Sequence, residues 1–139
     1  MFNNILVPTD LTEKSQKAFD IAVSIAINYQ SSITLLHVIE MIEGVEDEEF
    51  NAFYDKLRRR AQNTIEKMAN RYTGKDLLIN KEVILGKRVP EIIHFTNDNE
   101  IDLIILSSHK IEDFSSGDGW ATISYKVGIL ASCPVMMVK

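Results

Sequence analysis

The chain has 139 residues, 45% of them hydrophobic and 25% charged, a balance typical of one globular domain and not of a disordered segment. Its net charge of −5 argues against a nucleic-acid-binding surface, and its apolar runs are too short to span a bilayer. Cys133 is the only cysteine, which excludes an intrachain disulfide and a cysteine metal cluster. The N-terminus shows no basic segment before a long apolar one, so we expect a cytoplasmic protein without a secretory signal.

The first half of the chain predicts two buried strands, each followed by a helix. Residues 5–7 are an aliphatic run closed by a proline, and residues 33–39 are a second apolar run. Thr12 is a suitable N-cap for a helix over residues 13–29. An acidic segment, 40–49, leads into a long helix that Gly74 ends. We expect this helix to bury the stripe of Phe50, Phe53, Leu57, Ala61, Ile65, Met68 and Tyr72.

The second half predicts three strands and two helices. Residues 77–85 form a more polar strand, which favours a place near the sheet edge. Residues 102–106 form an uninterrupted apolar strand, and residues 135–138 form the last one. The two helices are outlined by Val89, Ile92, Ile93 and Thr96, and then, after a polar loop over 107–120, by Ile123, Val127 and Leu130.

Strict alternation of apolar strands and helices predicts a parallel sheet covered on both faces, in a single domain over residues 1–139. In such sheets ligands bind beyond the carboxyl ends of the strands, where the strand order reverses. The candidate residues are therefore those that follow strands, namely Pro8, Thr9, Asp10, Val38, Ser107, Ser108, His109 and Lys110.

These segments resemble the universal stress protein family along the whole chain. The resemblance rests on ILVPTDLTEKS at the start, LLHV in the second strand and the Gly-x-x-x-Pro-Glu-Ile-Ile segment from Gly86. It also rests on DLIILSSH in the fourth strand and ASCPVMMV at the end. It implies a Rossmann-like fold of the adenine nucleotide alpha hydrolase type, with strand order 3-2-1-4-5. It also implies an ATP site at the switch point between the first and fourth strands, and a homodimer formed through the last strand.

The phosphate-binding half of the family's ATP motif is altered in this sequence. Members that bind ATP carry Gly-x-x-Gly after the fourth strand, then nine residues and Gly-Ser or Gly-Thr. Here the glycine positions hold Ser107, Lys110 and Ala121, the spacer is one residue longer, and only Thr122 matches. Side chains at three glycine positions hinder close approach of backbone N–H groups to a phosphate and disfavour positive φ angles.

The adenosine half of the motif is retained. Asp10 matches the acidic residue that holds the ribose in ATP-binding members, and Val38 matches the position whose backbone meets adenine. Lys110 can supply charge to a phosphate, and Gly117 and Gly119 can form a shifted anion-binding turn. Asp10 also has a simpler role open to it, because aspartate satisfies N–H groups in turns and at helix starts.

The remaining titratable groups do not form an enzyme site in the sequence. His109 has no carboxylate or cysteine spaced as a partner, and His37 is interpreted as a hydrogen-bonded core residue. No nucleophile elbow is present, and no metal site is expected. The basic run Arg58, Arg59, Arg60 is interpreted as a solvated helix face.

An apolar strand at the chain end has unpaired backbone groups if it lies at the sheet edge. Pairing of Val135, Met136, Met137 and Val138 with their own copy would cover that edge and give a two-fold dimer. The first functional hypothesis is thus a homodimeric, non-enzymatic stress-response module with a degenerate ATP motif. The alternative is an adenine-nucleotide sensor, with slow ATP hydrolysis left open. A third is a ligand-free module that docks a protein partner through its acidic segment or its 111–120 loop. Neither nucleic acid nor membrane is expected as a partner.

Overall fold

The computed structural model describes residues 1–41, 48–108 and 120–139, with residues 120 and 121 described by their backbone alone. Five strands alternate with four helices within these ranges: β1 (Asn4–Pro8), α1 (Glu13–Tyr29), β2 (Ser32–Glu40), α2 (Glu48–Asn70), β3 (Ile79–Gly86), α3 (Arg88–Asp98), β4 (Leu103–Ser107), α4 (Trp120–Leu130) and β5 (Val135–Val138). The predicted sequence of elements is confirmed, and the predicted bounds differ by one or two residues at most strand ends.

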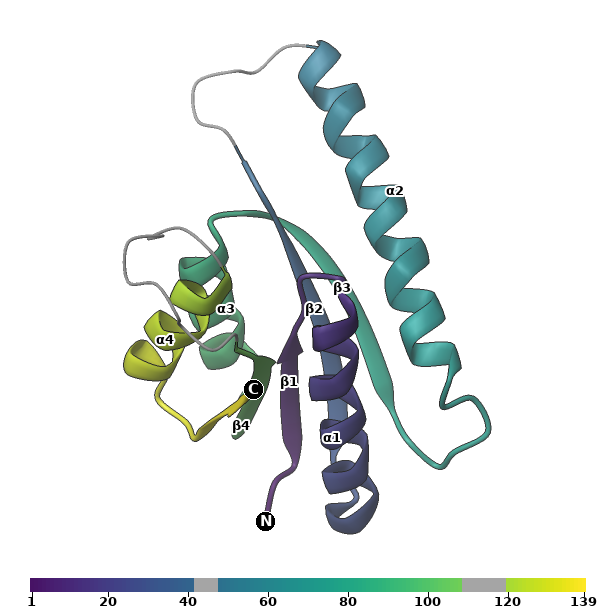
Figure 1. Cartoon of the computed structure of the whole chain (residues 1–139), viewed down its shortest axis with the longest axis vertical. Coiled ribbons are helices and arrows are strands. Elements are labelled where there is room, and N and C mark those ends of the chain that lie inside the picture. The colour runs from purple at the N-terminus through teal and green to yellow at the C-terminus, as the bar shows by residue number, and fades with distance from the viewer. Residues whose placement is uncertain (42–47, 109–119) are drawn as a thin grey trace.

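All pairings in the sheet are parallel, and the strand order is β3-β2-β1-β4-β5. The fold class and strand order expected from the sequence are therefore confirmed. The order reverses between β1 and β4, so the first connection runs to one side of β1 and a later one to the other (Figure 1). The polar strand β3 lies at one edge, as predicted, and β5 lies at the other.

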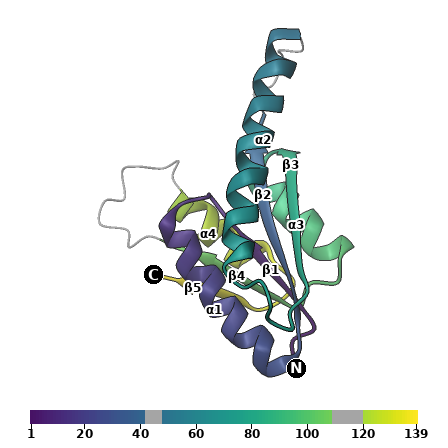
Figure 2. The same cartoon turned by 90° about the vertical axis from the view of Figure 1, so that its right-hand side faces the viewer.

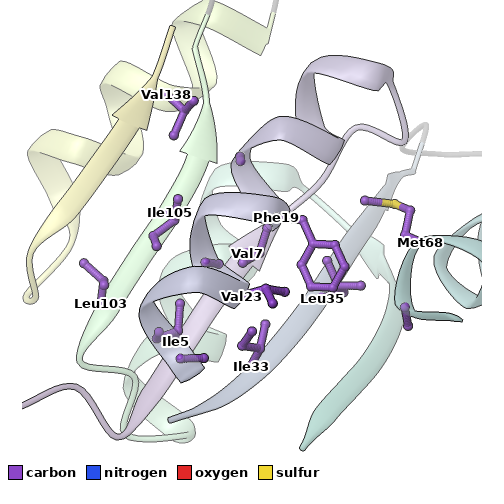
Figure 3. Close-up of a cluster of buried hydrophobic side chains, with 14 of the residues drawn as sticks. Ile5, Val7, Phe19, Val23, Ile33, Leu35, Met68, Leu103, Ile105 and Val138 are labelled. Atoms are coloured by element: carbon purple, nitrogen blue, oxygen red, sulfur yellow. The ribbon is translucent and has the colours of Figure 1, made fainter. Parts of the chain in front are cut away.

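Two apolar clusters, one on each face of the sheet, hold the helices in place. Alternate residues of a strand point to opposite faces, so Leu103 and Ile105 of β4 join the first cluster while Ile104 and Leu106 join the second. Figure 3 shows the first cluster, in which Phe19 of α1 packs among side chains of β1, β2 and β4 and of α2. The second cluster joins the sheet to α3 and α4. The result is a three-layer α/β arrangement (Figure 2).

The predicted buried stripe of the long helix is wrong at its N-terminal end. Phe53 is 53% exposed, whereas its neighbour Tyr54 is 7% exposed. The N-terminal half of α2 extends beyond the other helices (Figure 2), so few of the described residues lie beneath it to bury a full stripe. Further along, Ala61, Ile65 and Met68 are buried as expected.

The expectation for the last helix also needs correction at one position. Val127 is fully buried, but Leu130 is 59% exposed and its neighbour Ile129 is 82% exposed. These two exposed side chains lie at the C-terminal end of α4, which leads into the edge strand β5. None of the helices that the structure describes is both long and apolar enough to cross a membrane.

Candidate functional site

The carboxyl ends of β1 and β4 meet at the switch point, and the chain after β1 makes a tight polar turn there. Thr9 is buried, and its Oγ1 accepts the N–H of Leu11 at 3.0 Å. Leu11 has a positive φ of 68°, which non-glycine residues rarely adopt. This conformation turns the chain away from the sheet, so that α1 begins at Glu13.

The carboxylate of Asp10 is engaged by the first residues of this turn and of α1. Its Oδ1 accepts the N–H of Thr12 at 3.1 Å, the hydroxyl of Thr12 at 2.6 Å and the hydroxyl of Ser15. Ser15 Oγ in turn accepts the N–H of Asp10 at 3.1 Å. Thr12 stands at the predicted N-cap position but makes no side-chain cap, and its hydroxyl donates to Asp10. Asp10 therefore stabilises the turn and the start of α1, the simpler of the two roles considered for it.

Buried hydroxyls then connect this turn to β4. Ser15 Oγ lies 3.5 Å from Ser107 Oγ, and Ser108 Oγ accepts the hydroxyl of Ser124 at 3.0 Å. Strand alternation explains the two directions, since Ser107 points to the α1 face and Ser108 to the α4 face. Each of these four serines is at most 2% exposed. The end of β4 is thus joined through polar side chains to a helix on each face of the sheet.

The structure places the predicted site residues unequally. Pro8, Thr9, Asp10, Ser107 and Ser108 lie together at the switch point, and Thr122 is a half-buried residue of the first turn of α4. Ser107 does not have a positive φ, and its side chain lies inside the protein. His109, Lys110, Gly117 and Gly119 lie outside the described residues, and of Ala121 only the helical backbone is described.

Val38 lies apart from this network, at the end of β2. The last pair between β1 and β2 is Pro8 with Leu36, and Thr9 N–H still donates to Leu36 O at 2.8 Å, while β2 continues to Glu40. Backbone groups alternate in direction along a strand, so the N–H and C=O of Val38 point to the same side as those of Leu36. This is the side on which β1 pairs with Leu36, but β1 does not extend as far as Val38.

His37 is half-buried and its Nδ1 lies 2.8 Å from the backbone oxygen of Thr9. A carbonyl only accepts hydrogen bonds, so Nδ1 carries the proton and links the end of β2 to the turn after β1. Burial lowers the pKa of His37 below its ordinary value of 6.5, and the nearby Arg88 charge lowers it further, against the opposing effects of Thr9 and Asp10. The imidazole is therefore neutral at pH 7.

Other titratable groups show no catalytic arrangement within the described ranges. Cys133 is half-buried, and burial raises the pKa of its thiol, which disfavours the reactive thiolate. His94 is exposed on α3. No group of three or more His, Cys, Asp or Glu side chains that could hold a metal ion occurs in the part of the chain that the structure describes.

Sequence reasoning missed Ser15 and Ser124, which are central to the polar network. Ser15 stands at helical spacing before Ala18, Ala22 and Ala26, so its place on the buried face of α1 could be read from the periodicity. A polar residue on such a face requires a buried partner, which is a usable signal. Its partner Ser107 is 92 positions away and cannot be identified without the fold.

Comparison with known proteins agrees with this fold. The family model described as "Universal stress protein family" matches residues 1–139. The chain belongs to the universal stress protein family. A curated relative, universal stress protein YxiE of Bacillus subtilis, is 24% identical over 149 residues, with all of both chains covered.

Solved structures of the family have the same architecture. Universal stress protein UspA from Lactobacillus plantarum superposes with a TM-score of 0.81 at 23% identity, covering 99% of this chain and 98% of that one. Protein MJ0577 of Methanocaldococcus jannaschii gives a TM-score of 0.78 at 28% identity, with 100% and 96% covered. Of two more distant structures, one is a universal stress protein in complex with cAMP and the other is an Arabidopsis thaliana family member with AMP bound.

Proposed function

We propose that this universal stress protein is a homodimeric regulatory module without enzymatic activity, in which the ATP-binding cleft of the family is weakened. The observation that carries the proposal is the hydroxyl network at the switch point. Ser15 donates to Asp10 and lies 3.5 Å from the hydroxyl of Ser107, and Ser124 donates to Ser108. A phosphate site needs donors that face an open cleft. These side chains are instead used to hold β1, β4 and the two helices together.

A test of this proposal is the nucleotide content of gently purified protein. Mass spectra of the denatured sample should contain less than one ATP per ten chains, and phosphate release from added ATP should not exceed the buffer blank. ATP retained at near one equivalent would overturn the proposal, as would phosphate release that scales with protein concentration.

Dimerisation is supported by the free edge of the sheet. Among the described residues β5 pairs only with β4, and Met136 on this strand is 39% exposed. Pairing of β5 with its copy across a two-fold axis would cover the edge, and Ile129 and Leu130 would supply apolar area near it. Sedimentation should give twice the 15.8 kDa mass of one chain. A monomer at micromolar concentration would contradict this part of the proposal.

A second candidate function, an adenine-nucleotide sensor, is favoured by the backbone of Val38. Adenine presents a donor amino group beside an acceptor ring nitrogen, which is the complement of one C=O and one N–H on a strand. Val38 supplies these groups in the part of β2 that continues past the last residue paired with β1. Two structural neighbours were solved with cAMP and with AMP. Binding of adenosine or AMP with chemical-shift changes at Val38 would favour the sensor over the ligand-free module.

A further inference from the structure

A hollow lies on the α2 face of the sheet, apart from the hydroxyl network. It has a volume of about 390 Å³, within the range of small-molecule sites. It lies between the end of β2 and the middle of α2, and the turn after β1 and the first residue of α3 complete it. Its lining comprises Leu11, His37, Val38, Ile39, Glu40, Leu57, Arg60, Ala61, Thr64 and Arg88.

The lining combines an apolar floor with an excess of positive charge. Leu11, Ile39 and Leu57 contribute aliphatic side chains, while the guanidinium groups of Arg60 and Arg88 are the cations. Arg88 Nη1 is 3.8 Å from Glu40 Oε2, so the lining holds one carboxylate and two guanidinium groups. In a chain whose net charge is −5, this is a local positive site.

His37 adds a hydrogen-bond acceptor to the same hollow. Its Nδ1–H donates to Thr9 O, so Nε2 of the neutral ring has a lone pair. A ligand that suits the hollow therefore has a flat or branched apolar body, one negative group for a guanidinium, and one N–H or O–H donor. Guanidinium binds carboxylates in a bidentate manner, and a singly charged carboxylate costs less to place on an apolar floor than a phosphate does.

We propose that this hollow is a binding site for a small aromatic carboxylate; it shares Val38 with the nucleotide cleft but is not lined by Asp10 or Ser107. The basic run of α2 thus has more than one role. Arg60 lines the hollow, whereas the neighbouring Arg59 is exposed and does not line it. The two arginines differ by one position on the helix, so they provide a matched pair of variants with the same change in charge.

The test uses indole-3-acetate as the probe and its neutral amide as the control, followed by NMR of the ¹⁵N-labelled full chain. The acid should bind with a dissociation constant on the order of 0.1–1 mM, as expected for so few atoms. Shifts should be confined to residues 11, 37–40, 57–64 and 88. The amide should bind at least about fivefold more weakly, because it forms no charged pair with a guanidinium.

Arg60→Gln should weaken binding of indole-3-acetate by about fivefold or more. Arg59→Gln should weaken it by less than about twofold, because a screened charge outside the hollow contributes little. Both positions are exposed, so neither variant should affect folding. Equal affinity for acid and amide would overturn the proposal. So would equal weakening by the two variants, shifts centred on Thr9 and Thr122, or no shift at 10 mM probe.

Discussion

The hydroxyl oxygens of Ser15 and Ser107 lie 3.5 Å apart, although 92 positions separate the two serines in the chain. Ser15 also accepts the N–H of Asp10 and donates to its carboxylate, so α1, the turn after β1 and the end of β4 share one polar contact. Both serines are almost fully buried. Because unpaired buried hydroxyls are costly, this contact stabilises the fold at the switch point of the sheet.

Ser15→Ala should lower the free energy of unfolding by about 1–3 kcal/mol, because it leaves a half-buried backbone N–H and part of a carboxylate without their partner. Ser24→Ala, at an exposed position of the same helix, is the control and should change stability by no more than about 0.5 kcal/mol. Urea unfolding of the two variants checks this. Equal stability of both variants would show that the network adds nothing.

Two glycines should respond to alanine in opposite directions. Gly86 has φ 155°, and an added Cβ would lie 2.7 Å from Cγ of Glu91, so Gly86→Ala should cost about 1–3 kcal/mol. Gly128 is an exposed helical residue whose added Cβ would be 3.9 Å from Met137 Cε, so Gly128→Ala should stabilise by about 0.5–1 kcal/mol. Thermal unfolding separates the two results. Shifts of the same sign would contradict the backbone argument.

The lowered pKa of His37 predicts that stability falls in mild acid. When the folded pKa lies below 6.5, the unfolded state binds more protons as pH drops past 6.5. The contribution of His37 is therefore complete above that pH and is lost as pH falls toward the folded pKa. The loss of unfolding free energy between pH 7.5 and 5.5 should be smaller in His37→Gln. An NMR titration that gave His37 a pKa above 6.5 would refute this prediction.

Met136→Glu should dissociate the proposed dimer without unfolding the chain. Met136 is 39% exposed on the edge strand, whereas Val135 and Met137, which the sequence alone would nominate, pack against the second apolar cluster. Charging either of those two would disturb the monomer as well. Sedimentation of Met136→Glu should give 15.8 kDa together with an unchanged circular dichroism spectrum. A variant that remains dimeric would move the interface away from β5.

The strands and their order could be predicted because buried parallel strands are uninterrupted apolar runs, and Ile104 to Leu106 is a clear case. The exposure of Phe53 could not be predicted, because periodicity identifies an apolar face but not how far the protein extends beneath it. The same limit applies to Leu130. The rule for parallel sheets placed Asp10 and Ser107 at the switch point, and both lie there within reach of Ser15, while ligand binding at this point stays a prediction.

What the sequence did not reveal is how those residues are used. Asp10 had two roles open to it, and only its contacts with Thr12 and Ser15 show that the turn engages its carboxylate. Ser107 occupies a glycine position of the family's motif, and its side chain was expected to hinder the approach of backbone N–H groups to a phosphate. In the fold it points toward α1 and lies inside the protein, because alternation along β4 directs it there.

We propose that polar groups at the switch point stabilise the protein and do not favour the binding of a polyphosphate. This proposal is tested by calorimetric titration of one protein sample with adenosine, AMP and ATP. We predict that ATP binds no more than about threefold tighter than AMP, because none of the described donors at the switch point is directed at the additional phosphates. An absence of heat with all three ligands at millimolar concentration also agrees with the proposal. ATP binding tenfold or more tighter than AMP, with micromolar affinity, would contradict the account.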